Sequence, residues 1–211
     1  MKEKLNDLRQ NYNKFELVEE SVPKNPFELF KVWFEDTKNS EILEANAMTL
    51  GTVSSDGQVK LRVVLLKEYG AEGFTFFTNY NSEKGKNIGF NNKASLLFFW
   101  DRLHRQVRIE GEIVKISREE TLEYFNSRPY ESKIGAIASN QSSELESRES
   151  LEERYNKLLI DYPENPPCPE NWGGYVLKPS YIEFWQGRES RLHDRIVYEF
   201  TNDWQIKRLY P

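Results

Sequence analysis

The sequence predicts an α+β fold, an antiparallel β-barrel with peripheral helices. Strand-like segments rich in β-branched and aromatic residues, bounded by turn residues, dominate the middle and the end of the 211-residue chain. These segments do not alternate with helices as a doubly wound parallel sheet requires, and no glycine-rich dinucleotide-binding loop follows a strand. A curled antiparallel sheet with short helices outside it is the economical arrangement.

The chain divides into an N-terminal segment, residues 1–24, and a single domain, residues 25–211. The domain is expected to open with a helix from residue 26 to about residue 43, because Asn25 and Pro26 are typical of an N-cap and a first helical residue. Its aromatic side chains recur at helical spacing and are expected in the core: Phe27, Phe30, Trp33 and Phe34.

Strands are expected in the middle of the chain, at residues 47–53, 59–67, 73–78, 94–100 and 106–116. The first two are joined by a turn whose Asp56-Gly57 pair is typical of hairpins. A short helix over residues 82–91 follows the third strand and begins at a serine N-cap, Ser82.

The second half of the chain is expected to contain helices and then strands. The helices span residues 118–126, 130–138 and 143–161, and Pro129 separates the first two. A proline-rich loop over residues 162–170 leads to strands at residues 173–178, 181–186, 195–200 and 204–209.

Composition excludes several classes of protein. The net charge is −5, and no basic stripe of the kind that nucleic-acid-binding proteins carry is present. One cysteine and two histidines rule out an intrachain disulfide and argue against a metal site. Neither a signal peptide nor an apolar run of membrane-spanning length is found, so we expect a cytoplasmic protein without a membrane partner.

Several polar residues sit where a ligand could bind. Arg62 and Lys67 are five apart, so on a regular strand they would face opposite sides and could each meet an anion, or both could simply extend to solvent. Lys84 follows the Ser82 cap, and a helix start is a natural anion site, although a capped surface helix explains the pattern equally. Gln106 could donate and accept hydrogen bonds at the polar edge of a heterocycle, or it could face solvent.

A sharper set lies around residue 128. Tyr124, Arg128 and Ser132 are four apart, and even with Pro129 breaking the helix their side chains can converge. A phenol, a guanidinium and a hydroxyl suit a phosphate. His104 lies in an expected hairpin turn, and we assign it no role.

The run from Arg191 to Arg195, Arg-Leu-His-Asp-Arg, places two arginines, a histidine and an aspartate between expected strands. Arginine forks bind phosphates and flat anionic rings, and histidine exchanges protons near neutral pH. The run therefore predicts a binding site.

The chain resembles the pyridoxamine/pyridoxine 5'-phosphate oxidases nearly end to end, from Leu8 to Pro211. The resemblance rests on segments that occur in the family's order: RVVLLK, FFTN with SEKG, RQVRIEG, YFNSRP, SKIGAIASNQSS, NWGGY, IEFWQG, RLHDR and RLYP. It implies an FMN-binding split barrel that forms a homodimer, with two FMN sites in the subunit interface.

The resemblance also implies roles for individual residues. Those expected to bind FMN are Arg62, Val63, Val64, Leu65, Leu66, Lys67, Phe77, Thr78, Lys84, Gln106, Gln141, Ser142, Trp185 and Arg195. Those expected to bind substrate are Arg9, Tyr12, Lys67, Tyr124, Arg128, Ser132, Arg191, Leu192 and His193, with Arg191 and His193 as the catalytic pair. Arg9 and Tyr12 match an N-terminal segment that can cover the active site, and Asp194 is expected to orient the neighbouring arginines.

The implied reaction is the FMN-dependent oxidation of pyridoxamine 5'-phosphate and pyridoxine 5'-phosphate to pyridoxal 5'-phosphate. FMN accepts a hydride from the substrate, and molecular oxygen takes the electrons and becomes hydrogen peroxide. Two positions depart from the family. Glu83 replaces an arginine near the flavin phosphate and is expected to face away, and Phe77 replaces a common tyrosine.

Other functions stay open. A non-catalytic split barrel that binds flavin or pyridoxal phosphate would explain the flavin motifs but not the set around Arg128. A related flavin reductase or oxidase with another substrate, and a purely structural barrel, are further alternatives.

Overall fold

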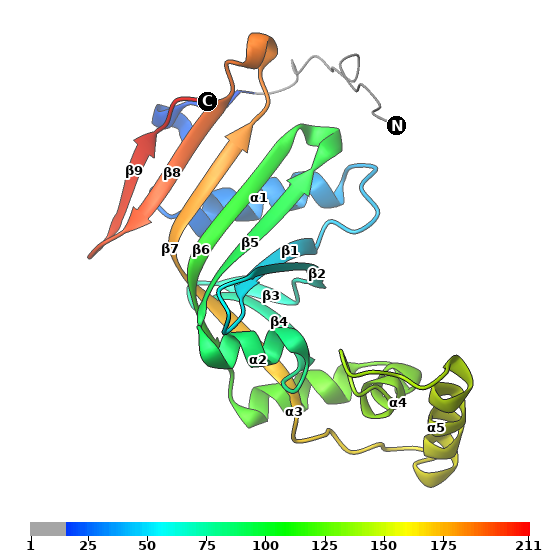
Figure 1. Ribbon diagram of the computed structural model, residues 1–211. Helices are drawn as coiled ribbons and strands as arrows, with labels where there is room; N and C mark the ends of the chain where they lie inside the picture. The colour runs from blue at the N-terminus through cyan, green and yellow to red at the C-terminus, as the bar shows by residue number, and fades with distance from the viewer. Residues whose placement is uncertain (1–15) are drawn as a thin grey trace, which may run out of the picture. The chain divides into compact units, whose positions relative to one another are not determined.

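The computed structural model describes residues 16–211, so the predicted substrate residues Arg9 and Tyr12 lie outside the described part. Its strands form one nine-stranded sheet in the order β2-β1-β5-β6-β7-β4-β3, with β8 paired to β7 and β9 to β8 (Figure 1). The β3–β4, β4–β7, β7–β8 and β8–β9 pairs are all antiparallel. Together with the helices α1 to α5, this sheet confirms the predicted α+β class.

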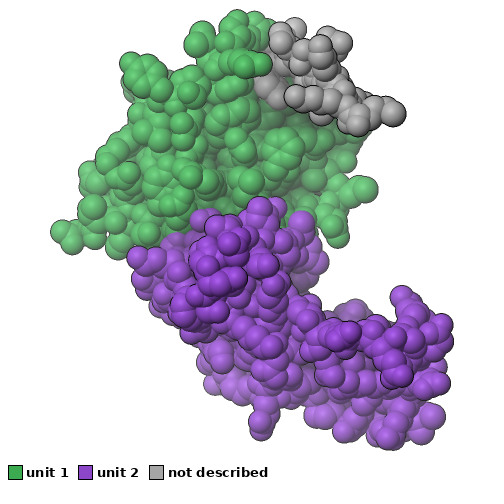
Figure 2. Space-filling model, in the orientation of Figure 1, with its two compact units in different colours: residues 1–48, 96–110, 179–211 green, residues 49–95, 111–178 purple. Residues whose placement is uncertain are grey.

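The chain forms two compact units, coloured separately in Figure 2. Of the described residues, unit 1 contains 16–48, 96–110 and 179–211, and unit 2 contains 49–95 and 111–178. The expectation of a single domain over residues 25–211 stays a prediction. Among residues 16–211, no helix is long and apolar enough to cross a membrane.

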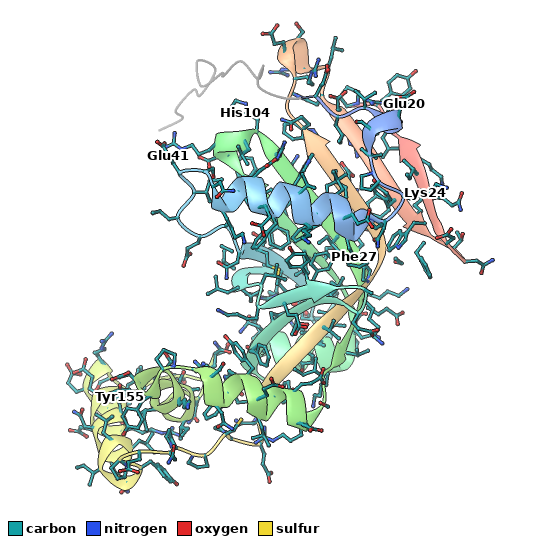
Figure 3. The ribbon with its side chains drawn as sticks, turned by 180° about the vertical axis from the view of Figure 1, so that it is seen from behind. Glu20, Lys24, Phe27, Glu41, His104 and Tyr155 are labelled. Atoms are coloured by element: carbon teal, nitrogen blue, oxygen red, sulfur yellow. The ribbon has the colours of Figure 1, made fainter. Side chains whose placement is uncertain are left out.

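Unit 1 is built on a long helix that crosses a sheet. The helix α1 (Pro26–Lys38) lies across one face of β5 (Lys93–Trp100), β6 (Arg105–Lys115) and β7 (Trp172–Gln186), as Figure 3 shows from behind. Its aromatic stripe supplies the core, since Phe30 meets Phe98 at 5.2 Å and Trp33 meets Phe184 at 5.1 Å between ring centroids. The outer strands β8 (Asp194–Phe200) and β9 (Trp204–Arg208) continue this sheet.

Short 3-10 turns complete unit 1: η1 (Glu19–Ser21), η2 (Asp101–Leu103) and η3 (Glu189–Arg191). The start of α1 is as predicted, with the Asn25 side chain accepting from the Phe27 N–H. Its predicted end near residue 43 is wrong. After Lys38 the Ser40 hydroxyl bonds to the Thr37 carbonyl, and this local bond competes with further helix.

Unit 2 combines a sheet with the remaining helices. Its elements are β1 (Ala47–Val53), β2 (Val59–Leu65), β3 (Glu68–Gly70), β4 (Gly73–Asn79), α2 (Glu83–Phe90), α3 (Arg118–Ser127), α4 (Tyr130–Ala138) and α5 (Arg148–Asp161). The short β3 was not predicted. Because β2 ends at Leu65 and the Lys67 N–H bonds to the Thr75 carbonyl, the argument that placed Arg62 and Lys67 on opposite faces of one strand does not apply.

Two further boundaries differ from the prediction. The helix α5 begins at Arg148 and not at residue 143, because Ser147 forms a capping box with Ser150. The strand β7 runs unbroken through Pro179, where two strands were expected. Residues 172–177 pair with β4 and residues 181–186 pair with β8, so the missing N–H of Pro179 falls between the two ladders and interrupts neither.

Candidate functional site

Unit 2 contains a cavity of about 610 Å³ with cations in its wall. It is bounded by the end of β2, by β4, by the first turn of α2 and by the α3–α4 junction. The residues that line it are Val63, Val64, Leu65, Lys67, Phe77, Thr78, Asn79, Lys84, Tyr124, Arg128, Pro129, Ser132, Gly135, Ala136, Ser139, Gln141 and Trp172.

The side of the cavity at α2 is a cluster of hydrogen-bond donors. Ser82 caps α2 by accepting from the Gly85 N–H, which places Lys84 in the first turn. The Lys84 ammonium and the Thr78 hydroxyl both donate to Oε1 of Gln141, at 3.1 and 2.9 Å. Burial lowers the pKa of Lys84, and the nearby Arg62 lowers it further. A positive group at a helix N-terminus, short of negative partners, favours an anion.

The side at the α3–α4 junction holds a guanidinium with an unused donor. Arg128 follows the last residue of α3, and its guanidinium lies 4.7 Å from the Trp172 ring centroid and 5.7 Å from that of Phe125. Its Nη1 is buried and has no hydrogen-bond partner among the described residues. Burial lowers the pKa of Arg128. A buried N–H without a partner costs free energy, so this atom is poised for an external acceptor.

The predicted phosphate set comes together here. Tyr124, Arg128 and Ser132 all line the cavity although Pro129 separates their helices, and Lys67 joins them from the end of β2. The Tyr124 ring stacks on Phe77 at 3.8 Å and is nearly parallel to Trp172. Trp172 was not predicted as a site residue, although it lies in the quoted NWGGY segment.

Three of the residues predicted to bind flavin in unit 2 do not line the cavity. Arg62 donates from Nη1 to the Leu50 carbonyl, the Lys60 carbonyl and, at 2.7 Å, the Thr52 hydroxyl. Leu66 is buried and Ser142 is exposed. The flavin contacts expected of these three residues stay predictions.

Glu83, which was expected to face away from the flavin phosphate, is half exposed and does not line the cavity. Its carboxylate lies 3.8 Å from the Lys60 ammonium. It still acts at longer range, because it raises the pKa of both Arg62 and Lys84 against the lowering effect of burial. The carboxylate therefore weakens the positive field at the α2 end of the cavity.

Unit 1 has a second cavity, of about 300 Å³. Its lining comprises three predicted flavin residues and four others: Gln106, Trp185 and Arg195, with Leu97, Arg108, Glu183 and Pro211. Trp185 and Arg195 are directly opposite each other on β7 and β8. The predicted set therefore divides between two clusters, one in each unit, and their joint use stays a prediction.

A buried carboxylate, Glu183, organises the second cavity. It accepts from Nε and Nη2 of Arg195 at 2.8 and 3.0 Å, from Nη2 of Arg108 at 2.7 Å and from the Tyr181 hydroxyl at 2.9 Å. Burial raises the pKa of Glu183, but the hydrogen bonds from Arg195 and Arg108 outweigh it and leave that pKa below its usual value. Arg195 also donates from Nη1 to the Tyr210 carbonyl. This fork fixes the Arg195 guanidinium.

Asp194 was expected to orient the arginines beside it in the sequence, but it pairs with two other arginines. Asp194 accepts from Nη1 of Arg208 at 2.8 Å and lies 3.7 Å from Nη1 of Arg188. Arg195 is held by Glu183, because adjacent residues of a strand point to opposite faces. Arg191 and Leu192 are exposed in the loop, and His193 is half-buried against Trp185, at 4.6 Å between ring centroids.

Two protein-family models match this chain, and together they cover most of it. Residues 34–159 match the family model described as pyridoxamine 5'-phosphate oxidase. Residues 172–211 match the model described as pyridoxine 5'-phosphate oxidase C-terminal dimerisation region.

Similar proteins cover nearly the whole chain. A pyridoxine/pyridoxamine 5'-phosphate oxidase of Paraburkholderia phytofirmans is 50% identical over 210 residues, which are 98% of this chain and 99% of that protein. One of Bordetella pertussis is 52% identical over 209 residues, again 98% and 99% of the two chains.

Solved structures share the fold. PhzG from Burkholderia lata 383, in complex with tetrahydrophenazine-1-carboxylic acid, superposes with a TM-score of 0.87 at 31% identity, over 91% of this chain and 95% of its own. A pyridoxamine 5'-phosphate oxidase-related, FMN binding protein of Nostoc punctiforme has a TM-score of 0.72 at 15% identity, over 90% and 99%. The predicted split barrel is confirmed by this likeness.

Proposed function

The chain belongs to the pyridoxamine 5'-phosphate oxidase family, and from this premise we propose that it oxidises pyridoxamine 5'-phosphate and pyridoxine 5'-phosphate to pyridoxal 5'-phosphate, with FMN as cofactor and oxygen as electron acceptor. The observation that carries the proposal is Arg128. Its buried, unpartnered Nη1 lies in a cavity wall shared with Lys67, Tyr124 and Ser132. That set suits a phosphate ester.

Charge balance supports a phosphate at this end of the cavity. Neither Arg128 nor Lys67 forms an ion pair within residues 16–211, although most arginines of unit 1 do. A buried N–H without an acceptor costs about 1–3 kcal/mol, and a charge-assisted hydrogen bond to phosphate would recover it. The Tyr124 and Ser132 hydroxyls supply neutral donors for the remaining oxygens.

The other end of the cavity fits FMN. Lys84 and Thr78 offer donors at the start of α2 for the flavin phosphate, and residues 63–65 of β2 and the Phe77 ring offer an extended wall for a flat ring system. When bound, FMN supplies the two-electron acceptor for the substrate. The chain's own part is to hold both phosphates, so that the distance between the two ring systems is set.

Unit 1 supplies groups of a different kind. Arg195, fixed by Glu183, and Gln106 present donors with little freedom to move, which suits the polar edge of a flavin. The exposed Arg191 guanidinium is free to lie over the substrate's pyridine ring and stabilise negative charge there. Arg191 and His193 are the proposed catalytic pair.

We further propose a homodimer. Residues 172–211 match the dimerisation region of the family. In addition, Val59, Leu61 and Val63 alternate along β2 with 65–68% of their surface exposed, so one face of this strand is an apolar stripe. An exposed stripe of this kind is typical of a surface that a partner covers.

The likeness to PhzG makes a phenazine-like carboxylic acid the competing substrate. A carboxylate presents two oxygens and one negative charge, whereas the set around Arg128 offers donors for a larger, more highly charged group. A non-catalytic binder of flavin or pyridoxal phosphate is the second competitor.

One experiment separates these functions. The purified protein is examined for a flavin spectrum, and oxygen uptake is measured with pyridoxamine 5'-phosphate, pyridoxine 5'-phosphate and the reduced compound tetrahydrophenazine-1-carboxylic acid. Turnover of either phosphate ester supports the proposal. Bound flavin without turnover would favour the binding protein, and no flavin even after FMN is added would overturn the cofactor assignment.

A variant tests the catalytic assignment. Arg191→Ala should lower kcat/KM by at least about tenfold while FMN stays bound, since loss of one charge-assisted contact of 1.5–3 kcal/mol corresponds to that factor or more. The exposed Arg148, which pairs with Glu152 on α5, provides the matched control Arg148→Ala. Release of FMN by Arg191→Ala would show that Arg191 belongs to the flavin side.

A further inference from the structure

The loop that carries Arg191 and His193 is held in a conformation that its residues would not adopt unaided. Ser190 has φ 54° and ψ 20°, and Arg191 has φ 62°, so two successive residues other than glycine are left-handed. This region costs an ordinary residue about 1 kcal/mol or more and persists only where the surroundings enforce it. The loop must therefore be anchored on both sides.

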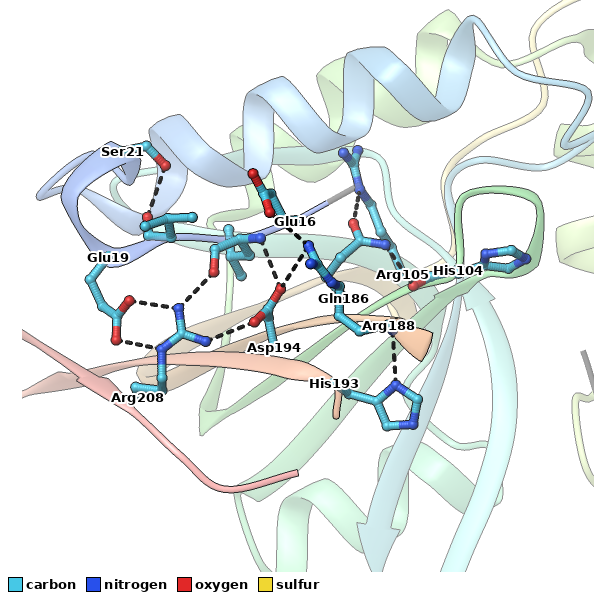
Figure 4. Close-up of polar contacts among 12 residues, drawn as sticks. Glu16, Glu19, Ser21, His104, Arg105, Gln186, Arg188, His193, Asp194 and Arg208 are labelled. Atoms are coloured by element: carbon cyan, nitrogen blue, oxygen red, sulfur yellow. Dashed lines mark hydrogen bonds and ion pairs between the residues drawn. The ribbon is translucent and has the colours of Figure 1, made fainter. Parts of the chain in front are cut away.

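The anchors are visible at each end of the loop (Figure 4). At the first end, Gln186 donates to the Leu103 and His104 carbonyls and accepts from Nε of Arg105 at 2.9 Å. At the second end, Asp194 accepts from the Leu17 N–H at 3.1 Å and from Arg208. Gln186 and Asp194 are themselves opposite each other in the β7–β8 ladder.

Within the loop, one hydrogen bond determines the state of a side chain. The backbone N–H of Arg188 donates to Nδ1 of His193 at 3.0 Å (Figure 4). A backbone N–H can only donate, so Nδ1 must carry a lone pair. A neutral imidazole has one protonated nitrogen, and here that nitrogen must be Nε2.

The charges around the imidazole also favour the neutral form. Burial lowers the pKa of His193, the Arg191 guanidinium lowers it further, and Asp194 opposes them to a smaller extent. The Asp194 carboxylate is already engaged with the Leu17 N–H, Arg208 and Arg188. Protonation at Nδ1 would set two N–H groups against each other and break the bond from Arg188.

We infer that His193 serves as a neutral hydrogen-bond donor through Nε2–H to an acceptor atom of the substrate, and that it is not the group that takes up a proton in the reaction. The need for a substrate rests on the proposed function. The tautomer does not, because the loop of the free protein fixes it. Trp185, packed against the ring, limits its rotation and so aims the Nε2–H.

Nitrogen NMR of the full-length, 15N-labelled protein tests the tautomer directly. The chain has two histidines, so the signals lost in His193→Gln identify His193. At pH 7 we expect an unprotonated Nδ1, a protonated Nε2 and a titration midpoint below about 6.5, the usual value for histidine. A protonated Nδ1, in either a neutral or a charged ring, would overturn the inference.

Kinetics of two variants test the donor role. The Gln side chain places its amide N–H₂ near the position of Nε2–H, whereas that of Asn reaches only the position of Nδ1. His193→Gln should keep kcat/KM within about tenfold of the parent, and His193→Asn should lose more than that, chiefly through KM. Loss of about 100-fold or more in kcat for His193→Gln, with KM unchanged, would indicate a base and refute the donor role.

The two measurements also separate this inference from the proposed function. If neither phosphate ester is oxidised, the proposed function fails, yet the NMR result still decides the tautomer. If turnover is found with a protonated Nδ1, the function stands and the inference fails.

Discussion

Replacing the buried carboxylate Glu183 by glutamine should destabilise unit 1 and loosen Arg195. Glu183→Gln keeps the shape of the side chain and removes its charge. The carboxylate now accepts four hydrogen bonds, three of them from the guanidinium groups of Arg195 and Arg108. An amide has a single oxygen, so one of its two positions must present N–H₂ to a guanidinium donor.

The magnitude follows from these bonds. A hydrogen bond to a charged group contributes about 1.5–3 kcal/mol, and one between neutral groups contributes about half of that. The full loss on breaking a buried pair is about 3–5 kcal/mol, but both arginines are partly exposed, so solvent screens part of it. We expect the free energy of unfolding to fall by about 2–3 kcal/mol.

Chemical denaturation of the parent and two variants provides the assay. Glu110 pairs with the same Arg108 at 3.0 Å, but its side chain is 42% exposed against 8% for Glu183, so Glu110→Gln is a matched control. We expect the control to cost less than about 1 kcal/mol. FMN titrations should show weaker binding for Glu183→Gln and no change for Glu110→Gln.

The effect should depend on pH with a definite sign. The pKa of Glu183 is lower in the folded protein than its usual value, so its stabilisation is present above the unfolded pKa, about 4.3. It is lost as pH falls through the folded pKa. The difference between parent and Glu183→Gln should therefore shrink in acid. Equal losses of unfolding free energy for Glu183→Gln and Glu110→Gln at pH 7 would refute the role given to the hydrogen bonds of Glu183. A difference between parent and Glu183→Gln that grows in acid would refute it as well.

Two further substitutions test the cation-lined cavity of unit 2. Arg128→Met should lower the affinity for pyridoxal 5'-phosphate by at least about tenfold, because a charged hydrogen bond to the phosphate is lost. The free energy of unfolding should change by less than about 1 kcal/mol, because removing a buried N–H that has no partner offsets the lost contact with Trp172. Equilibrium dialysis measures the affinity, and chemical denaturation measures the free energy of unfolding. A large loss of stability would contradict the conclusion that Nη1 of Arg128 has no hydrogen-bond partner. Glu83→Arg should tighten FMN binding about three- to tenfold at low salt, because a carboxylate that weakens the positive potential at Lys84 is replaced by a cation. The gain should become smaller at high salt, which screens the charge. Flavin fluorescence titrations at two salt concentrations check this, and an affinity gain that salt leaves unchanged would argue against a field effect.

The sequence predicted the parts of the site that depend on local spacing. Tyr124, Arg128 and Ser132 could be grouped because they are four apart, and all three line the same cavity although Pro129 separates their helices. Ser82 and Lys84 could be placed at a helix start because serine is a common N-cap. Strand lengths such as that of β1 followed from turn residues at their ends.

The hydrogen bonds that hold Arg195 to Glu183 could not be predicted from spacing in the sequence. Glu183 is twelve residues from Arg195 and 75 from Arg108, and the pairing of β7 with β8 and with β6 brings them together. Asp194, adjacent to Arg195, looked the better partner, but strand alternation turns it to the other face. The register of a sheet, which pattern alone does not define, decided both outcomes.

The two clusters differ in how their cations are neutralised, and under the proposed function this difference predicts a separate role for each cluster. In unit 1, Arg195 and Arg108 share Glu183, and Arg208 and Arg188 share Asp194. In unit 2, Lys67, Lys84 and Arg128 line the cavity and pair with no carboxylate among residues 16–211. Cations that are already paired gain little from a phosphate but keep their direction. If the proposed function holds, the unpaired cations of unit 2 would therefore bind the phosphates, and the ion-paired groups of unit 1 would orient the rings.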